Sequence, residues 1–140
     1  MLFRGANYTH EVDTIKELDN FVSINSAIEV DLFGQVNSEF AGGKQLSGTG
    51  GAVDFMRAAN TSSGGKSIIA MNATAKGVKK SKIVPKVEMV TALRTDVDIV
   101  VTEFGVARIK DLPVKERGRA LVDIAAPEFR DELLADPLFD

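Results

Sequence analysis

Residues 46–57 read LSGTGGAVDFMR, and the expected organisation of the chain follows from this stretch. Gly48, Gly50 and Gly51 place three glycines in four positions, which suits a turn with positive φ and uncovered N–H groups. Apolar and polar residues then alternate at helical spacing over 53–59, so the loop is predicted to open into a helix. The first N–H groups of a helix have no internal partner, and the helix dipole adds partial positive charge there. The stretch therefore predicts a site for an anion, or for an oxygen on which negative charge develops.

The spacing of these glycines excludes two well-known phosphate-binding loops. No Gly-Lys-Ser/Thr closes the loop, so the Walker pattern is absent. The dinucleotide-binding pattern needs Gly-x-Gly-x-x-Gly, whereas this chain has Gly-x-Gly-Gly. Spacing alone leaves two interpretations open, an anion or oxyanion site and a purely structural turn.

Composition bounds the class of protein. The 140 residues, of which 44% are hydrophobic and 26% charged, are typical of one soluble globular domain. A net charge of −3 gives no reason to expect nucleic acid or a membrane as a partner, and no apolar run approaches the length of a membrane span. The chain has no cysteine, which excludes disulfides and thiolate chemistry and is compatible with a cytoplasmic location. The single histidine, His10, excludes a zinc site with two histidines, and we expect it to have a surface or capping role.

Predicted strands and helices alternate along the chain, so the predicted fold is α/β, a single domain over 1–140 with a mixed, mainly parallel sheet flanked by helices. The period-two pattern of 21–33 predicts one strand with Val22 and Ile24 on its buried face. In 114–125, Arg117 and Arg119 are expected to point outward. Strands are further predicted at 36–40, 67–71, 83–85, 87–90 and 98–102, helices at 13–19, 114–125 and 127–134, irregular structure at 1–10 and a basic loop at 73–81.

Three ordered blocks carry a resemblance to a known family. Residues 22–39 (VSINSAIEVDLFGQVNSE), 47–57 (SGTGGAVDFMR) and 101–107 (VTEFGVA) resemble the carboxy-terminal domain of the acetyl-CoA hydrolase/transferase family, most of all its butyrate and 4-hydroxybutyrate CoA-transferases. The resemblance implies a CoA-transferase-like α/β domain whose substrates are an acyl-CoA and a short-chain carboxylate. It implies a ping-pong reaction through a glutamyl-CoA thioester, with no covalently bound cofactor and no metal.

The resemblance also implies roles for individual residues. The backbone N–H groups of Gly50 and Gly51 would act as oxyanion donors. Residues expected to contact CoA are Gly48, Thr49, Gly50, Gly51 and Lys76, and those expected in the substrate pocket are Asn37, Ser38, Glu39 and Glu103. A structural role in holding loops stays open for both Glu39 and Glu103. The family's usual Gly-Gly-Gln is Gly50-Gly51-Ala52 here, so a contact from that glutamine side chain is missing.

In this family the nucleophilic glutamate lies upstream of the block that begins near Asn7. The acidic residues at 11, 13, 17, 29, 31 and 39 do not fit its motif, so we expect the catalytic glutamate and an amino-terminal half to lie outside these 140 residues. The chain alone is then expected to lack transferase turnover, to expose an apolar patch and to self-associate. A non-catalytic CoA-binding or assembly module and an acyl-CoA hydrolase are the alternatives.

Overall fold

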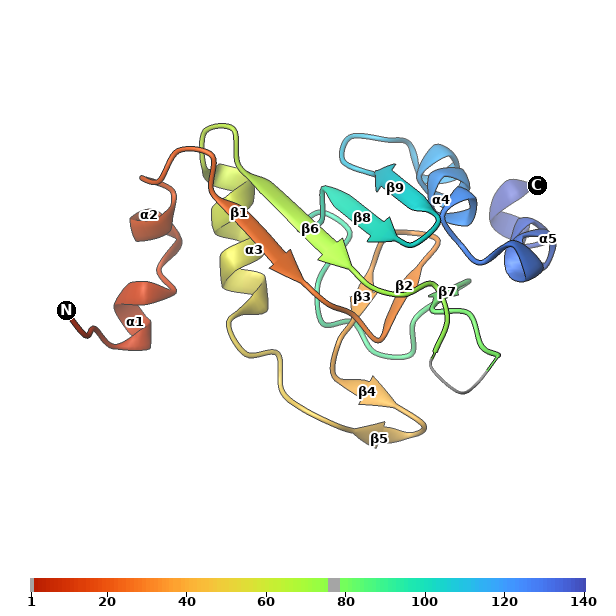
Figure 1. Cartoon of the computed structure of the whole chain (residues 1–140), viewed down its shortest axis with the longest axis horizontal. Coiled ribbons are helices and arrows are strands. Elements are labelled where there is room, and N and C mark those ends of the chain that lie inside the picture. Colours follow the sequence, from red (N-terminus) through yellow and green to blue (C-terminus); the bar gives the residue numbers. More distant parts are fainter. Residues whose placement is uncertain (1, 76–78) are drawn as a thin grey trace.

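The computed structural model describes residues 2–75 and 79–140, and its centre is a four-stranded sheet (Figure 1). Its strands, in spatial order, are β1 (Val22–Asn25), β6 (Lys66–Ala70), β8 (Ile99–Thr102) and β9 (Gly105–Arg108). β1, β6 and β8 are parallel, whereas β9 returns antiparallel to β8. This mixed, mainly parallel sheet with flanking helices confirms the predicted fold class.

Two helices cover one face of this sheet. They are α3 (Ala52–Thr61), which lies behind β1 and β6 in Figure 1, and α4 (Val114–Asp123). Met56 of α3 and Leu121 of α4 belong to one buried cluster with Ile69 of β6 and Val100 of β8. Burying one such side chain contributes roughly 1.5–3 kcal/mol, so this cluster fixes α3 on the sheet.

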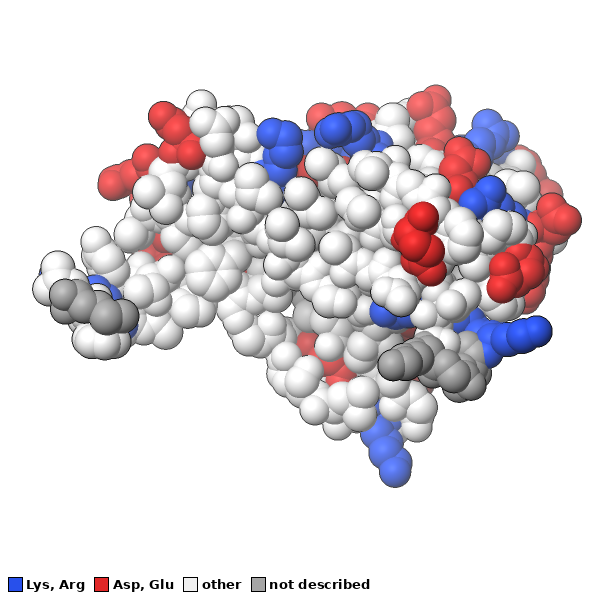
Figure 2. All heavy atoms as spheres, viewed as in Figure 1, with Lys and Arg blue, Asp and Glu red and all other residues white. Residues whose placement is uncertain are grey.

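The opposite face of the sheet, which we call the outer sheet face, is formed by Val22, Ile24, Ile68, Val101 and Val106. Val22, Ile24 and Val106 are 45%, 66% and 56% exposed. Figure 2 shows the middle of this view largely free of charged side chains, with charges gathered near the upper edge and over the carboxy-terminal helices. No helix of the described chain covers these residues.

A smaller sheet joins β3 (Val36–Asn37), β2 (Glu29–Asp31) and β7 (Ile83–Val84). Asp31 of β2 is fully buried, and its carboxylate organises the sheet. Oδ1 accepts the N–H groups of Phe33 (3.0 Å) and Gln35 (2.9 Å), while Oδ2 accepts Gln35 Nε2 (2.9 Å) and the N–H of Val87 (3.3 Å). The hairpin β4 (Phe40–Ala41)–β5 (Lys44–Gln45) follows, turning at Gly42 and Gly43, whose φ values are +59° and +73°.

Short helices form both ends of the described chain, which lie on opposite sides of the molecule (Figure 1). The amino-terminal ones are α1 (Ala6–Thr9) and α2 (Val12–Ile15), and α2 packs against α3. The carboxy-terminal ones are η1 (Pro127–Phe129), α5 (Arg130–Leu134) and η2 (Pro137–Phe139). No helix in the described residues is long and apolar enough to cross a membrane.

The strand predicted over 21–33 is wrong as a single element. It breaks at 26–28 into β1 of the large sheet and β2 of the small one. Val22 and Ile24 point outward, and Ser23 is the buried residue between them. Period two continues through the break, so the local pattern does not reveal that the chain changes sheets.

Three smaller predictions are also corrected, and one strand was missed. Residues 6–9 form α1 instead of irregular structure, residues 87–90 form no strand, and β9 was not predicted. Arg117 of α4 points inward and is 8% exposed, whereas Arg119 is exposed as expected. The long aliphatic stem of an arginine can pack in a core when its head finds acceptors, which a simple polar-outward rule overlooks.

Candidate functional site

The glycine loop opens directly into α3, as predicted from residues 46–57. Gly48, Thr49 and Gly50 are exposed, and Gly50 has a φ of +54°. Gly51 is the N-cap of α3, and its carbonyl accepts the N–H of Phe55 (3.1 Å). No side chain within the described ranges caps this helix, so its first N–H groups keep donor capacity for a guest. We call Gly50, Gly51 and this first turn the glycine corner.

An open hollow of about 560 Å³ lies beside the glycine corner. Its lining is Ala6, Asn7, His10, Glu11, Gly50, Gly51 and Asp54. The His10 ring packs against Phe55 in a tilted arrangement, with centroids 4.7 Å apart, and its Nδ1 lies 3.0 Å from Thr9 Oγ1. A Cβ built on Gly51 would overlap the His10 ring, so this glycine is needed for the close approach. His10 also ends α1 as its C-cap residue.

The charges around this hollow decide which guest it suits. Its acidic lining residues are Glu11 and Asp54, and no lysine or arginine of the described chain lines it. Two carboxylates repel a phosphate, whereas N–H donors at a helix start still attract a neutral carbonyl oxygen. The glycine corner is therefore better suited to a neutral carbonyl oxygen than to a phosphate group.

Three residues predicted for the substrate pocket, Asn37, Ser38 and Glu39, lie together next to the start of the glycine loop, where the N–H of Leu46 donates to the Glu39 carbonyl. Asn37 is buried; its Nδ2 donates to Phe40 O (2.7 Å), and its Oδ1 accepts the N–H groups of Glu39 (3.2 Å) and Phe40 (3.0 Å). Ser38 Oγ donates to the carbonyl of Ser26 (3.3 Å). These bonds hold the turn between β3 and β4.

Glu39 ties the hairpin to the glycine loop. Its carboxylate accepts Gln45 Nε2 (3.1 Å) and Thr91 Oγ1 (3.2 Å), and its carbonyl accepts the N–H of Leu46 (2.7 Å). The side chain is 8% exposed. The geometry matches the structural alternative for Glu39, and its contact with a substrate stays a prediction.

Glu103 lies elsewhere, just beyond the carboxyl end of β8. It is exposed, and its Oε2 accepts the N–H of Ala73 (2.8 Å). The carboxyl ends of β1 and β6 meet nearby at a hollow of about 430 Å³, lined by Ser26, Ala27, Ile28, Ala70, Met71, Asn72, Thr74, Ala75 and Lys82. Ligands of α/β proteins commonly bind at this edge of a parallel sheet.

Among the described residues that line this second hollow, Lys82 is the one basic residue, and sequence reasoning missed it. Burial lowers the pKa of Lys82, while the carboxylates of Glu103 and Glu29 oppose that shift. In the sequence, the only feature that could have indicated Lys82 is its position directly before the apolar Ile83, which is buried in the fold. Lys76, predicted to contact CoA, lies outside the described residues.

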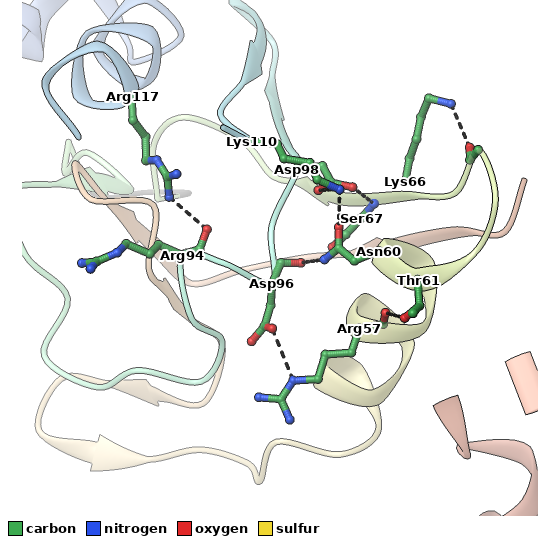
Figure 3. Close-up of polar contacts among 11 residues, drawn as sticks. Arg57, Asn60, Thr61, Lys66, Ser67, Arg94, Asp96, Asp98, Lys110 and Arg117 are labelled. Carbon is green, nitrogen blue, oxygen red and sulfur yellow. Dashed lines mark hydrogen bonds and ion pairs between the residues drawn. The ribbon is translucent and has the colours of Figure 1, made fainter. Parts of the chain in front are cut away.

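Polar contacts hold α3 to the segment before β8, and so fix the direction of the helix that begins at the glycine corner (Figure 3). Arg57 Nε lies 3.3 Å from Asp96 Oδ1, and Asn60 Nδ2 donates to the Asp96 carbonyl (2.9 Å). Lys110 Nζ lies 3.2 Å from both Asn60 Oδ1 and Asp98 Oδ1. Within the described ranges no cluster of acidic or histidine side chains is suited to a metal ion.

Comparison with known proteins identifies relatives of the whole chain. A family model described as the acetyl-CoA hydrolase/transferase C-terminal domain matches residues 1–136. The chain is 50% identical over 133 residues to a 4-hydroxybutyrate coenzyme A transferase of Clostridium kluyveri, covering 93% of this chain and 31% of that protein. It is 42% identical over 136 residues to a butyryl-CoA:acetate CoA-transferase of Anaerostipes caccae, covering 93% and 30%.

Solved structures agree with these matches. The crystal structure of RipA from Yersinia pestis superposes with a TM-score of 0.85 at 43% identity, over 91% of this chain and 29% of that one. The chain thus spans about three-tenths of the length of its relatives, as the shares of 31%, 30% and 29% show.

Proposed function

Because this chain belongs to the acetyl-CoA hydrolase/transferase family, whose C-terminal domain it matches, we propose that it supplies the oxyanion-stabilising backbone of a CoA-transferase. The observation that carries the proposal is the glycine corner, where exposed Gly50 and half-buried Gly51 precede a helix that no side chain caps. The proposed substrates are an acyl-CoA and a short-chain carboxylic acid.

In the proposed reaction, a glutamate carboxylate attacks the carbonyl carbon of the thioester. The carbonyl oxygen gains negative charge, and the N–H groups of Gly50 and Gly51 donate to it. The carbon–sulfur bond then breaks, which leaves an acyl-glutamyl anhydride and the CoA thiolate. The thiolate attacks the glutamyl carbonyl of the anhydride, whose C–O bond breaks to release the donor acid as its carboxylate and to leave the glutamyl-CoA thioester. The acceptor carboxylate then reverses these steps and leaves as the new acyl-CoA. One preorganised donor of this kind is worth roughly 3 kcal/mol of transition-state stabilisation.

We propose that the nucleophilic glutamate lies in the longer protein, outside these 140 residues. Glu39 already accepts hydrogen bonds from Gln45 and Thr91, and Glu103 accepts the N–H of Ala73. A carboxylate whose oxygens are held in this way is a poorer nucleophile than one with unshared lone pairs. The glycine corner would take the thioester end of the substrate, while the CoA phosphates, repelled by Glu11 and Asp54, would lie away from it.

We further propose that the outer sheet face is covered by the rest of the longer protein. This face exposes Val22, Ile24 and Val106, and among the described strands β1 has a neighbour, β6, on one side only. Exposed apolar surface of this kind marks an interface, and an unpaired strand edge accepts a further strand. The 140 residues produced alone would then self-associate through this face, and light scattering that shows a strict monomer at high concentration would contradict the proposal.

A matched pair of loop variants tests the glycine corner in the full-length protein. Gly48 and Gly50 are both exposed, and a methyl group on either meets nothing within 4 Å. Only Gly50 has a positive φ, +54°, which an alanine adopts at a cost of roughly 1–2 kcal/mol. Gly50→Ala should therefore reshape the corner and Gly48→Ala should not.

The measurement is acyl-CoA:carboxylate exchange under steady-state conditions. Gly50→Ala is expected to lower kcat about 100-fold, the effect of losing one oxyanion donor, while Gly48→Ala stays near wild type. Circular dichroism confirms that both variants are folded. Equal activity of the two variants would refute the assignment, and CoA release without an acceptor acid would identify a hydrolase instead.

A further inference from the structure

Arg117 is a buried cation that no carboxylate of the described chain pairs with directly. Its guanidinium donates to three backbone carbonyls, those of Phe33 (3.3 Å), Arg94 (2.9 Å, drawn in Figure 3) and Leu112 (3.5 Å). Its Nε is buried and has no hydrogen-bond acceptor within residues 2–75 and 79–140. A buried charge held only by carbonyl dipoles is costly, and a bound anion would relieve that cost.

Arg117 lines a hollow of about 180 Å³ together with Arg94, Thr95, Val97, Lys110 and Asp111. This lining brings three cationic side chains against a single carboxylate. Burial and then the positive charge of Arg94 lower the pKa of Arg117, whereas Asp111 opposes the shift. Lys110 is shared with Asp98, whose Oδ1 lies 3.2 Å from Lys110 Nζ. Arg117 already donates to three carbonyls, so the exposed side chain of Arg94 is the cation most available to a guest.

We propose that this hollow, which we call the Arg117 hollow, binds a phosphate group. Three cations outnumber the carboxylates beside them, which are Asp111 in the lining and Asp98 against Lys110, and the surroundings of the hollow therefore attract an anion. A phosphate monoester carries nearly two negative charges at pH 7. The arginine fork matches phosphate oxygens, and the Thr95 hydroxyl can donate as well.

The Arg117 hollow is separate from the glycine corner. The two hollows share no lining residue, and their lining charges have opposite signs. Phosphate binding here therefore stands whether or not Gly50 and Gly51 serve as oxyanion donors. The phosphate could come from free inorganic phosphate or from a larger phosphorylated compound such as CoA, and these two sources share the same chemistry.

Titration calorimetry on the purified full-length protein tests the proposal, with inorganic phosphate as the probe and sodium acetate at equal ionic strength as the comparison. Arg94→Ala is the informative variant because the Arg94 side chain is exposed, and the carbonyl that Arg117 uses stays in place. Its matched control is Arg119→Ala, an exposed arginine of α4 outside the hollow. Arg94→Ala should weaken phosphate binding at least about ten-fold, the effect of one lost charge-assisted hydrogen bond, while Arg119→Ala leaves it unchanged.

Competition separates the two sources of phosphate. If CoA displaces inorganic phosphate and dephospho-CoA, which lacks the 3′-phosphate, does not, the site takes the CoA phosphate; if neither displaces it, the site takes free phosphate. Equal binding of phosphate and acetate, or equal loss in Arg94→Ala and Arg119→Ala, would overturn the proposal. Loss of transferase activity in Gly50→Ala bears only on the glycine corner.

Discussion

The close approach of His10 to Gly51 predicts a specific energetic coupling across the glycine corner. Gly51 has a φ of −91°, which alanine adopts without strain, but an added Cβ would overlap the His10 ring. The ring is the end of a side chain and can rotate away. This rotation gives up the tilted aromatic contact with Phe55, at 4.7 Å between centroids, which is worth about 0.5–1.5 kcal/mol.

A second cost of Gly51→Ala comes from its place as N-cap. Alanine is a poorer N-cap than glycine, by about 0.5 kcal/mol. The single substitution is therefore expected to lower the free energy of unfolding by roughly 1–2 kcal/mol. In a domain of this size that corresponds to a fall in Tm of about 2–4 °C for each kcal/mol.

A double-mutant cycle isolates the steric part. His10→Ala alone should cost about 1 kcal/mol, because the aromatic contact is lost. In that background Gly51→Ala should cost only the capping difference, so the two substitutions should be sub-additive by about 1 kcal/mol. Urea denaturation of the four proteins provides the measurement. Gly48→Ala, whose methyl group meets open space, is the control and should cause no loss.

Additive effects of His10→Ala and Gly51→Ala would refute this reasoning. Additivity within about 0.3–0.5 kcal/mol is what independent sites show, and it would mean that the ring does not lie over the glycine.

Three further predictions concern stability. Gly65→Ala should lower the free energy of unfolding by about 3 kcal/mol in urea denaturation, because the added Cβ would overlap the backbone oxygens of Ala59 and Phe21. Side-chain rotation cannot relieve this overlap. A urea midpoint equal to that of the wild type would contradict the close approach of α3, β1 and β6 at Gly65. Leu32→Ala, at a fully buried position, should cost about 2–5 kcal/mol by the same measurement, and a loss below 1 kcal/mol would count against the packed core. Folding lowers the pKa of Lys82 below 10.5, its value in the unfolded chain. At pH values between the folded-state and unfolded-state pKa, the unfolded chain therefore binds more protons, and the free energy of unfolding should rise as the pH approaches 10.5. Lys82→Met should remove that rise, measured as the difference in urea midpoint between the two proteins at pH 7 and pH 10; identical pH dependence would exclude Lys82 as its source.

The local features of the fold could be predicted because each depends on neighbouring residues. Glycine spacing and the amphipathic run predicted the loop and α3, and the apolar runs predicted β6 and β8. The helices predicted at 114–125 and 127–134 begin where α4 and η1 begin, each next to a proline, Pro113 or Pro127.

The errors arise where the fold depends on distant partners. β1 and β2 form one period-two pattern, yet they belong to different sheets. Arg117 carries the sequence signature of a surface residue, and only the carbonyls of Phe33, Arg94 and Leu112 explain why it is buried. The grouping of Asn37, Ser38 and Glu39 followed from their adjacency, whereas Lys82 reaches the carboxyl edge of β1 and β6 through tertiary packing.

The parallel pairing of β1 with β6 also has a kinetic consequence. Val22 pairs with Lys66, so the hairpin, the glycine loop and α3 must all be accommodated between the two strands before their ladder closes. β8 and β9 meet across a tight turn and can pair within about 1–10 µs, whereas contacts between distant residues form far more slowly. During synthesis β1 therefore leaves the ribosome without its neighbour, and its pairing waits until β6 has been made.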